Sequence, residues 1–202
     1  MWLRFPIASV FVCLFLCEPV VAFEIFALGA SYVNCRGVDR DKTFSAKLQE
    51  ILRADGFDAT VINGGVDGDE PRFMVQRLKA SINQNTRMVI FFPGANDRST
   101  LNAEYSEKIL AYLAEQHIPT IYASAEIIQT SEQAGEMAAK HHAYYYGRWR
   151  KDVPVDDIHY QFDHWRGSAE IAGGHMTAAG CQLVATNMAP LVERVLREGD
   201  IH

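Results

Sequence analysis

The chain has 202 residues, of which 49% are hydrophobic and 22% are charged. This composition is that of a globular protein and excludes an intrinsically disordered chain. The formal net charge is −6, so the chain lacks the overall positive charge by which proteins hold nucleic acid. Four cysteines are too few for a disulfide scaffold. The sequence also lacks a run of about 20 apolar residues, which an ordinary membrane span needs.

The start of the chain has the pattern of a secretory signal peptide. A short basic beginning is followed by an apolar run over residues 5–16, and Ala22 ends a sequence that fits the cleavage rule for signal peptidase. The sequence therefore predicts a signal peptide over residues 1–22 and a single domain over residues 23–202. It also predicts a secreted or periplasmic location. An uncleaved N-terminal anchor is the alternative.

Short, continuously apolar runs predict four strands, at residues 24–28, 59–62, 88–92 and 119–123. Between and after them, apolar residues recur at the spacing of a helix face. The expected helices contain residues 44–52, 74–82, 109–113, 132–142 and 183–196. Pro190 is expected to kink the last helix or to mark a weak turn in it.

Continuously apolar strands that alternate with helices favour a parallel sheet covered on both faces. The predicted fold class is therefore α/β, with a doubly wound sheet. The segment 124–165 is the least regular part of the chain, and its residues 144–151 mix tyrosines with Arg148, Arg150 and Lys151. We favour an ordinary amphipathic loop for residues 144–151. A groove for an acyl chain or glycan, or a contact with anionic head groups, is the alternative.

Four unusual segments are expected at the carboxyl edge of this sheet, where doubly wound proteins bind their ligands. GASY follows the first strand, NGGVDGD the second and GAND the third, while GGHMT precedes the last helix. They supply Ser31, a glycine loop around Gly68, Asn96 and His175. A nucleophile, a backbone donor, an amide donor and a base are the parts of an acyl-transfer site. Each residue type alone is common in caps, turns and surfaces, so the combination carries the prediction.

The segments FALGASY, VINGGVDGD, FPGAND and GGHMTAAG resemble, in this order, the four blocks of the SGNH (GDSL-type) hydrolase family. The resemblance implies a three-layer α/β/α, flavodoxin-like fold with about five parallel strands. It also implies hydrolysis of esters or thioesters, in a range that includes lysophospholipids, other acyl lipids, aryl esters and acetylated sugars. By the same resemblance Ser31 is the nucleophile and His175 the general base. The backbone amides of Ser31 and Gly68 and the side chain of Asn96 form the oxyanion hole.

Two positions depart from the family pattern. Ala30 stands where the family usually has an aspartate that is not catalytic, and Ala172 stands where the family places the aspartate of the triad. A triad aspartate fixes the tautomer of the histidine and stabilises its protonated form. Three alternatives stay open for His175: the backbone carbonyl near Ala172 orients it, Glu170 or Asp163 does so, or no group does. The last alternative leads to a slow enzyme or to a non-catalytic binding protein that keeps the hydrolase fold.

Neither a cofactor nor a metal ion is expected to take part. The sequence lacks the common nucleotide-binding, zinc-protease and paired-cysteine motifs, and its histidine pairs are expected at the surface rather than around a metal. The expected partner is a small-molecule ester or an ester of a lipid or glycan. Nucleic acid is not expected to bind, no stable membrane span is expected in the mature chain, and a monomer is expected.

Cys35 and Cys181 are predicted to form a disulfide. They are the two cysteines that remain after removal of a signal peptide, and disulfides persist outside the cytosol. Cys35 lies four residues after Ser31 and Cys181 six residues after His175. If Ser31 and His175 meet, each cysteine is about one helical turn beyond its neighbour, and a bridge becomes plausible. Two buried free thiols are the alternative.

Overall fold

The structure, a computed structural model, describes residues 22–125, 128–154, 156–161 and 174–199. Its centre is a five-stranded sheet in which all neighbouring strands are parallel, in the order β2-β1-β3-β4-β5. The strands are β1 (Phe23–Gly29), β2 (Ala59–Gly65), β3 (Thr86–Phe92), β4 (Thr120–Ser124) and β5 (Tyr144–Arg148). The predicted α/β class with a doubly wound sheet is confirmed.

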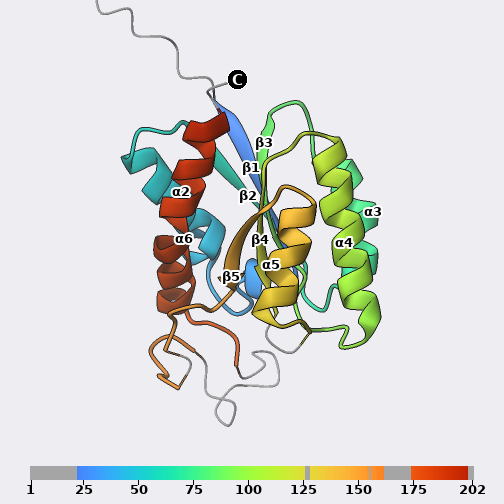
Figure 1. Ribbon diagram of the computed structural model, residues 1–202. Helices are drawn as coiled ribbons and strands as arrows, with labels where there is room; N and C mark the ends of the chain where they lie inside the picture. The colour runs from blue at the N-terminus through green and yellow to red at the C-terminus, as the bar shows by residue number, and fades with distance from the viewer. Residues whose placement is uncertain (1–21, 126–127, 155, 162–173, 200–202) are drawn as a thin grey trace, which may run out of the picture.

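Helices cover both faces of the sheet, and Figure 1 shows the three layers with the sheet seen between them. α2 and α6 lie on one face, and α3, α4 and α5 lie on the other. The helical segments are α1 (Ser31–Asn34), η1 (Arg40–Lys42), α2 (Phe44–Ala54), α3 (Pro71–Ser81), α4 (Thr100–Glu115), α5 (Ser131–Lys140) and α6 (Ala178–Gly199). In the described part of the chain, no helix combines the length and the apolar character that a membrane crossing requires.

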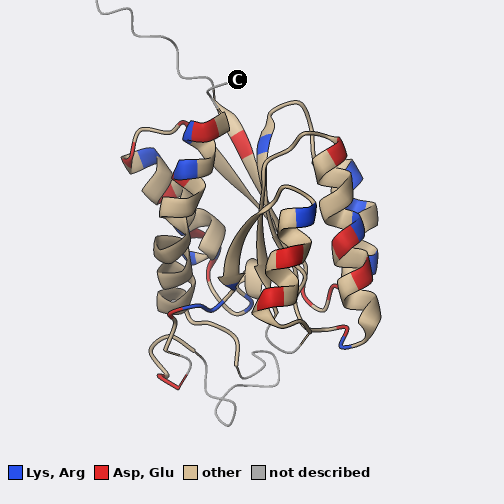
Figure 2. Ribbon diagram, in the orientation of Figure 1, with Lys and Arg blue, Asp and Glu red and all other residues tan. Residues whose placement is uncertain are grey.

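The core consists of two clusters because neighbouring residues of a strand point to opposite faces. In β1, Ile25 and Ala27 belong to the cluster under α2 and α6, whereas Phe26 and Leu28 belong to the cluster under α3, α4 and α5. Strand β3 alternates in the same way. Burial on both faces explains why these strands have continuously apolar sequences. Figure 2 shows the complementary pattern, with most charged residues on the helices and few on the strands.

The helix boundaries follow local signals in the sequence. Thr43 and Ser99 cap α2 and α4 by accepting hydrogen bonds from backbone amides, and Thr130 forms a capping box with Gln133 at the start of α5. Pro71 is the first residue of α3, a position that does not need its missing amide hydrogen. All five predicted helices are present. The last one is assigned as a single helix that contains Pro190.

Four of the five strands lie where the sequence predicts them, whereas the interpretation of residues 144–151 as a loop is wrong for residues 144–148 and holds only for the turn at 149–151. Residues Tyr144–Arg148 form β5, which pairs with β4 at the edge of the sheet. The segment lacks the usual strand pattern because it is only partly buried, and its pairing with β4 contains a register shift. Trp149, directly after this strand, is 1% exposed and stacks on Phe92.

Candidate active site

The strand order places a crevice between the carboxyl ends of β1 and β3. The chain leaves β1 toward α2 on one face of the sheet, and it leaves β3 toward α4 on the other. The two connections therefore diverge and leave a crevice between them, which is the usual ligand position in this topology. Ser31 follows β1 and Asn96 follows β3, so both residues reach this point.

Ser31 is the first residue of the short helix α1 and is 7% exposed. The chain turns sharply between β1 and α1, and Gly29 makes the turn possible. A Cβ atom at Gly29 would collide with the side chain of Val33 and would lie 2.8 Å from the carbonyl oxygen of Phe92. The turn therefore holds Ser31 directly at the end of the strand.

His175 reaches Ser31 from the other end of the chain. Its Nε2 atom lies 2.8 Å from Oγ of Ser31. His175 is half-buried and lies three residues before Ala178, where the long helix α6 begins. A serine hydroxyl hydrogen-bonded to an imidazole is the arrangement in which the histidine can take the hydroxyl proton.

The predicted disulfide between Cys35 and Cys181 is confirmed. The two Cα atoms are 6.5 Å apart, and the bridge spans 146 positions of the sequence. Cys35 is the C-terminal cap of α1, and Cys181 lies in the first turn of α6. The bridge therefore joins the element that carries Ser31 to the helix that follows His175.

Tyr32 supports the histidine from one side. Its ring stacks on the imidazole of His175, with centroids 5.1 Å apart and planes 21° apart. Its hydroxyl donates a hydrogen bond of 2.8 Å to the carbonyl oxygen of Gly174. Tyr32 therefore contacts both the ring and the backbone of the segment that ends in His175.

Asn96 lies at the same crevice and is held by one of its two amide hydrogens. Its Nδ2 donates to the carbonyl oxygen of Asp69 at 2.8 Å. Asp69 is 8% exposed and accepts a charged hydrogen bond of 2.6 Å from Arg77. Arg77 also donates to the carbonyl oxygens of Gly29 and Gly64 at the ends of β1 and β2. These bonds connect the loop after β2 rigidly to the ends of the strands.

Gly68 lies next to this anchor but does not line the crevice. Its φ is +76°, in the left-handed region that favours glycine, and no neighbour would contact a Cβ atom there. Glycine is therefore needed for the backbone conformation and not for space. Within the described residues, the backbone N–H groups of Ser31 and Gly68 donate no hydrogen bond.

A cavity of about 360 Å³ surrounds the Ser31–His175 pair. It brings together Ser31, His175 and Asn96, three of the four predicted site residues. Its walls include aromatic rings, small residues and two arginines: Ala30, Ser31, Tyr32, Phe92, Gly94, Ala95, Asn96, Arg98, Ser124, Ala125, Trp149, Arg150, Gly174 and His175. The mixture of apolar walls and a few convergent polar groups is typical of a small-molecule site.

Ala172, Glu170 and Asp163, the three groups considered as partners of His175, lie outside the described residues. Asp97, which adjoins Asn96, has a structural role. Hydrogen bonds from the side chain and the backbone amide of Ser99 keep the pKa of the Asp97 carboxyl below its usual value. Asp97 therefore remains a carboxylate that orders the loop before α4.

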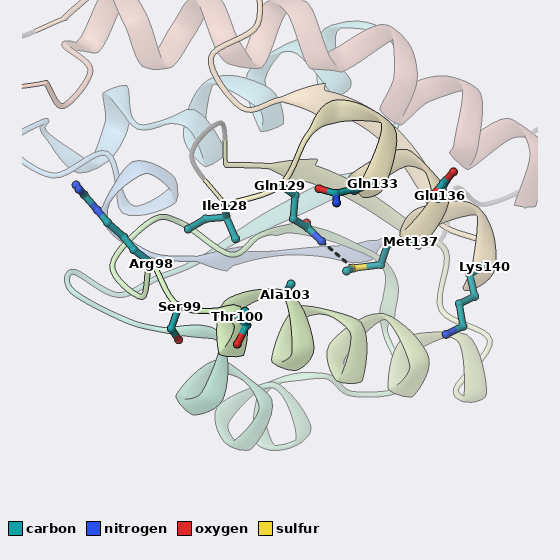
Figure 3. A pocket seen from close by; sticks show the side chains of 10 residues that line it. All are labelled: Arg98, Ser99, Thr100, Ala103, Ile128, Gln129, Gln133, Glu136, Met137 and Lys140. Carbon is teal, nitrogen blue, oxygen red and sulfur yellow. Dashed lines mark hydrogen bonds between the residues drawn. The ribbon is translucent and has the colours of Figure 1, made fainter.

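A second cavity, of about 490 Å³, lies between the start of α4 and helix α5. Figure 3 shows the side chains that line it, among them Gln129, Gln133 and Met137. Arg98 lines this cavity as well as the one around Ser31. A third and larger cavity, of about 1030 Å³, includes Phe23 and Thr86 at the amino ends of their strands. Volume alone therefore does not identify the site.

Sequence reasoning missed the parts of the site that depend on contacts between distant segments. Local patterns do not predict that Tyr32, Arg98 and Trp149 line the cavity. Arg150 belongs to the basic segment 144–151, but its position beside Tyr32 depends on the fold. The one local signal is an aromatic residue directly after the candidate nucleophile. In the part of the chain that the structure describes, no group of three potential metal-ligating side chains occurs.

No protein-family model matches the chain, and no curated protein matches it. Solved structures do match. AlinE4, described as an SGNH-hydrolase family esterase, is 24% identical, with 87% of this chain and 97% of that chain covered and a TM-score of 0.63. The psychrotrophic esterase EstA from Pseudoalteromonas sp., in a structure inhibited by monoethylphosphonate, is 14% identical, with 86% and 98% covered and a TM-score of 0.68.

A third structure is a putative lipolytic protein of the G-D-S-L family from Desulfitobacterium hafniense DCB-2. It is 14% identical, with 83% of this chain and 98% of that chain covered and a TM-score of 0.66. At these identities the likeness shows that the chain has the fold of SGNH-type esterases. The three-layer fold implied by the sequence motifs is thereby confirmed.

Proposed function

We propose that the protein is a serine ester hydrolase of the SGNH type. The observation that carries the proposal is the 2.8 Å contact between Ser31 Oγ and His175 Nε2 inside a cavity that Asn96 also lines. The two residues are 144 positions apart in the sequence, so only the fold brings them together. The shared fold with esterases supports the same reaction class.

The proposed reaction begins when Ser31 Oγ attacks the carbonyl carbon of the ester. His175 Nε2 accepts the hydroxyl proton, which requires that Nδ1 carries a proton in the neutral ring. The tetrahedral intermediate expels the alcohol, which takes the proton from His175. Water then attacks the acyl-enzyme with His175 again as the base, and the carboxylic acid leaves. These steps use only protein groups and water.

The negative charge on the carbonyl oxygen is stabilised in this proposal by the backbone amide of Ser31 and by Asn96. Gly68, which the sequence motifs predict as a further donor, does not line the cavity. Asn96 has two amide hydrogens, and its bond to Asp69 uses one of them. The second hydrogen is available for the oxyanion. Since Asp69 is itself fixed by Arg77, the donor is positioned before the reaction starts, which is what oxyanion stabilisation requires.

We expect Asn96→Ala to lower kcat by about 10²–10³-fold, the typical effect of losing one oxyanion donor. KM should change little, because the lost bond forms in the transition state. Steady-state kinetics on 4-nitrophenyl acetate measure both constants. Asn85→Ala is the matched control, since Asn85 is an exposed asparagine before β3, at the opposite end of the sheet. Wild-type kcat in Asn96→Ala would exclude this donor role.

Ala172→Asp should raise kcat, because a carboxylate stabilises the protonated form of His175 better than a neutral carbonyl does. An increase of about 10-fold or more is expected if a carbonyl now orients the ring correctly. Glu170→Gln and Asp163→Asn serve as controls in the same assay. If either control abolishes turnover while Ala172→Asp has no effect, a displaced carboxylate already serves His175 and this prediction is wrong.

The proposed function is tested by covalent labelling. A fluorophosphonate should react with the protein, and mass spectrometry should locate the adduct on the peptide that contains Ser31. Covalent labelling of Ser31 would also exclude the alternative function, a binding protein without a working nucleophile. Absence of both labelling and ester turnover would overturn the proposal.

The proposal includes export from the cytosol by the signal peptide predicted over residues 1–22. These residues lie almost wholly outside the described part of the chain. The Cys35–Cys181 disulfide supports export, because structural disulfides are rare in the cytosol.

A further inference from the structure

Two arginine side chains line the cavity that contains Ser31 and His175. Arg98 comes from the loop between β3 and α4, and Arg150 comes from the segment after β5. In Figure 3 the Arg98 side chain points away from the other labelled residues, toward the blue segments at the start of the chain. Two cationic groups from distant parts of the sequence therefore converge on one site.

Arg150 is held in position without losing its charge. Its Nη1 donates to the side-chain oxygen of Gln161 at 2.9 Å, and its guanidinium carbon lies 5.4 Å from the centre of the Tyr32 ring. Gln161 is 8% exposed, so this acceptor is itself fixed. Both partners are uncharged. Because a guanidinium has five N–H donors, several remain available to a ligand.

Three acidic residues in the loops after β2 and β3 are already engaged. Asp67 pairs with Arg36 at 3.6 Å, Asp69 pairs with Arg77 at 2.6 Å, and Asp97 accepts from Ser99. Among the residues that the structure describes, no carboxylate forms an ion pair with Arg98 or Arg150, and none lines the cavity. The described residues that line the cavity therefore give it positive charge, in a chain of net charge −6.

We propose that the natural substrate is an anionic ester, whose carboxylate or phosphate group binds Arg98 and Arg150 while Ser31 attacks the ester carbon. This inference rests on the proposed hydrolase function and adds the charge of the substrate to it. Guanidinium groups bind carboxylates and phosphates through paired, charge-assisted hydrogen bonds. Ser31 and His175 still hydrolyse the ester bond, and the two arginines determine which esters are preferred.

The test compares two esters that have the same acetyl group, 4-acetoxybenzoate and its methyl ester. We expect kcat/KM to be at least about 10-fold higher for the anionic ester, the effect of one charge-assisted hydrogen bond. The preference should decrease as salt concentration rises. Arg98→Gln and Arg150→Gln should each reduce the ratio of the two kcat/KM values. Arg87→Gln is the matched control, since Arg87 is exposed at the start of β3, at the other end of the sheet.

A second pair of substrates separates a soluble anion from a lipid head group. Monoesters of glycerol 3-phosphate with a butyryl or a palmitoyl chain carry the same phosphate. Sensitivity of both to the arginine variants supports recognition of the anion itself, and sensitivity of the palmitoyl ester alone supports recognition of a lipid head group. Equal kcat/KM values for 4-acetoxybenzoate and its methyl ester, or a ratio unchanged in both arginine variants, would overturn the inference while leaving the hydrolase function intact. Lack of turnover of every ester would overturn both.

Discussion

Ser31→Ala is expected to abolish ester hydrolysis while the fold remains intact. Removal of the nucleophile from a serine hydrolase typically lowers kcat by about 10⁶-fold. Without the serine no acyl-enzyme can form, and the remaining groups can only bind the ester and stabilise the oxyanion. Ser31 is small, and loss of its hydroxyl removes one hydrogen bond to His175 without opening a large cavity. Unfolding by urea should therefore show little change, while turnover of 4-nitrophenyl acetate disappears.

Ser131→Ala is the matched control for this experiment. Ser131 is exposed at the start of α5, and its substitution removes the same hydroxyl outside the site. Fluorophosphonate labelling should persist in Ser131→Ala and vanish in Ser31→Ala. Wild-type turnover in Ser31→Ala would assign the nucleophile to another residue and would remove the basis of the proposed mechanism.

Loss of the Cys35–Cys181 disulfide is expected to have the largest effect on stability. The bridge closes a loop of 146 positions. In the chain-entropy model, a loop of this length stabilises the folded state by about 4–5 kcal/mol, a large part of the stability of a typical domain. The double variant Cys35→Ala/Cys181→Ala should therefore unfold at a much lower urea concentration than the wild type.

The same variant should also lose activity under conditions in which it remains folded. The bridge joins α1, which begins at Ser31, to α6, which follows His175. Without the bridge, the distance between the nucleophile and the base is less tightly fixed. Reduction of the wild type should reproduce the stability change, and the double variant should not respond to reductant. Titration of two free thiols in denatured, unreduced protein would show that the bridge does not form in solution.

The sequence by itself determined the layout of most secondary structure because the signals for it are local. Period-four apolar spacing, caps such as Thr43 and Thr130, and continuously apolar runs each act within about one or two turns or along one strand. These signals located five helices and four strands. β5 was missed because edge strand Tyr144–Arg148 is only partly buried, so neither alternation nor a continuous apolar run marks it.

Motif reasoning also brought Ser31, Asn96 and His175 to one edge of the sheet, because the ends of parallel strands meet there. Only the tertiary structure decided what surrounds them. Tyr32 stacks on His175, a contact between residues from opposite ends of the domain's sequence. Arg98 and Arg150 likewise enter the cavity from separate segments. Such contacts depend on loop conformation and on the packing of distant elements, which no local pattern of residues encodes.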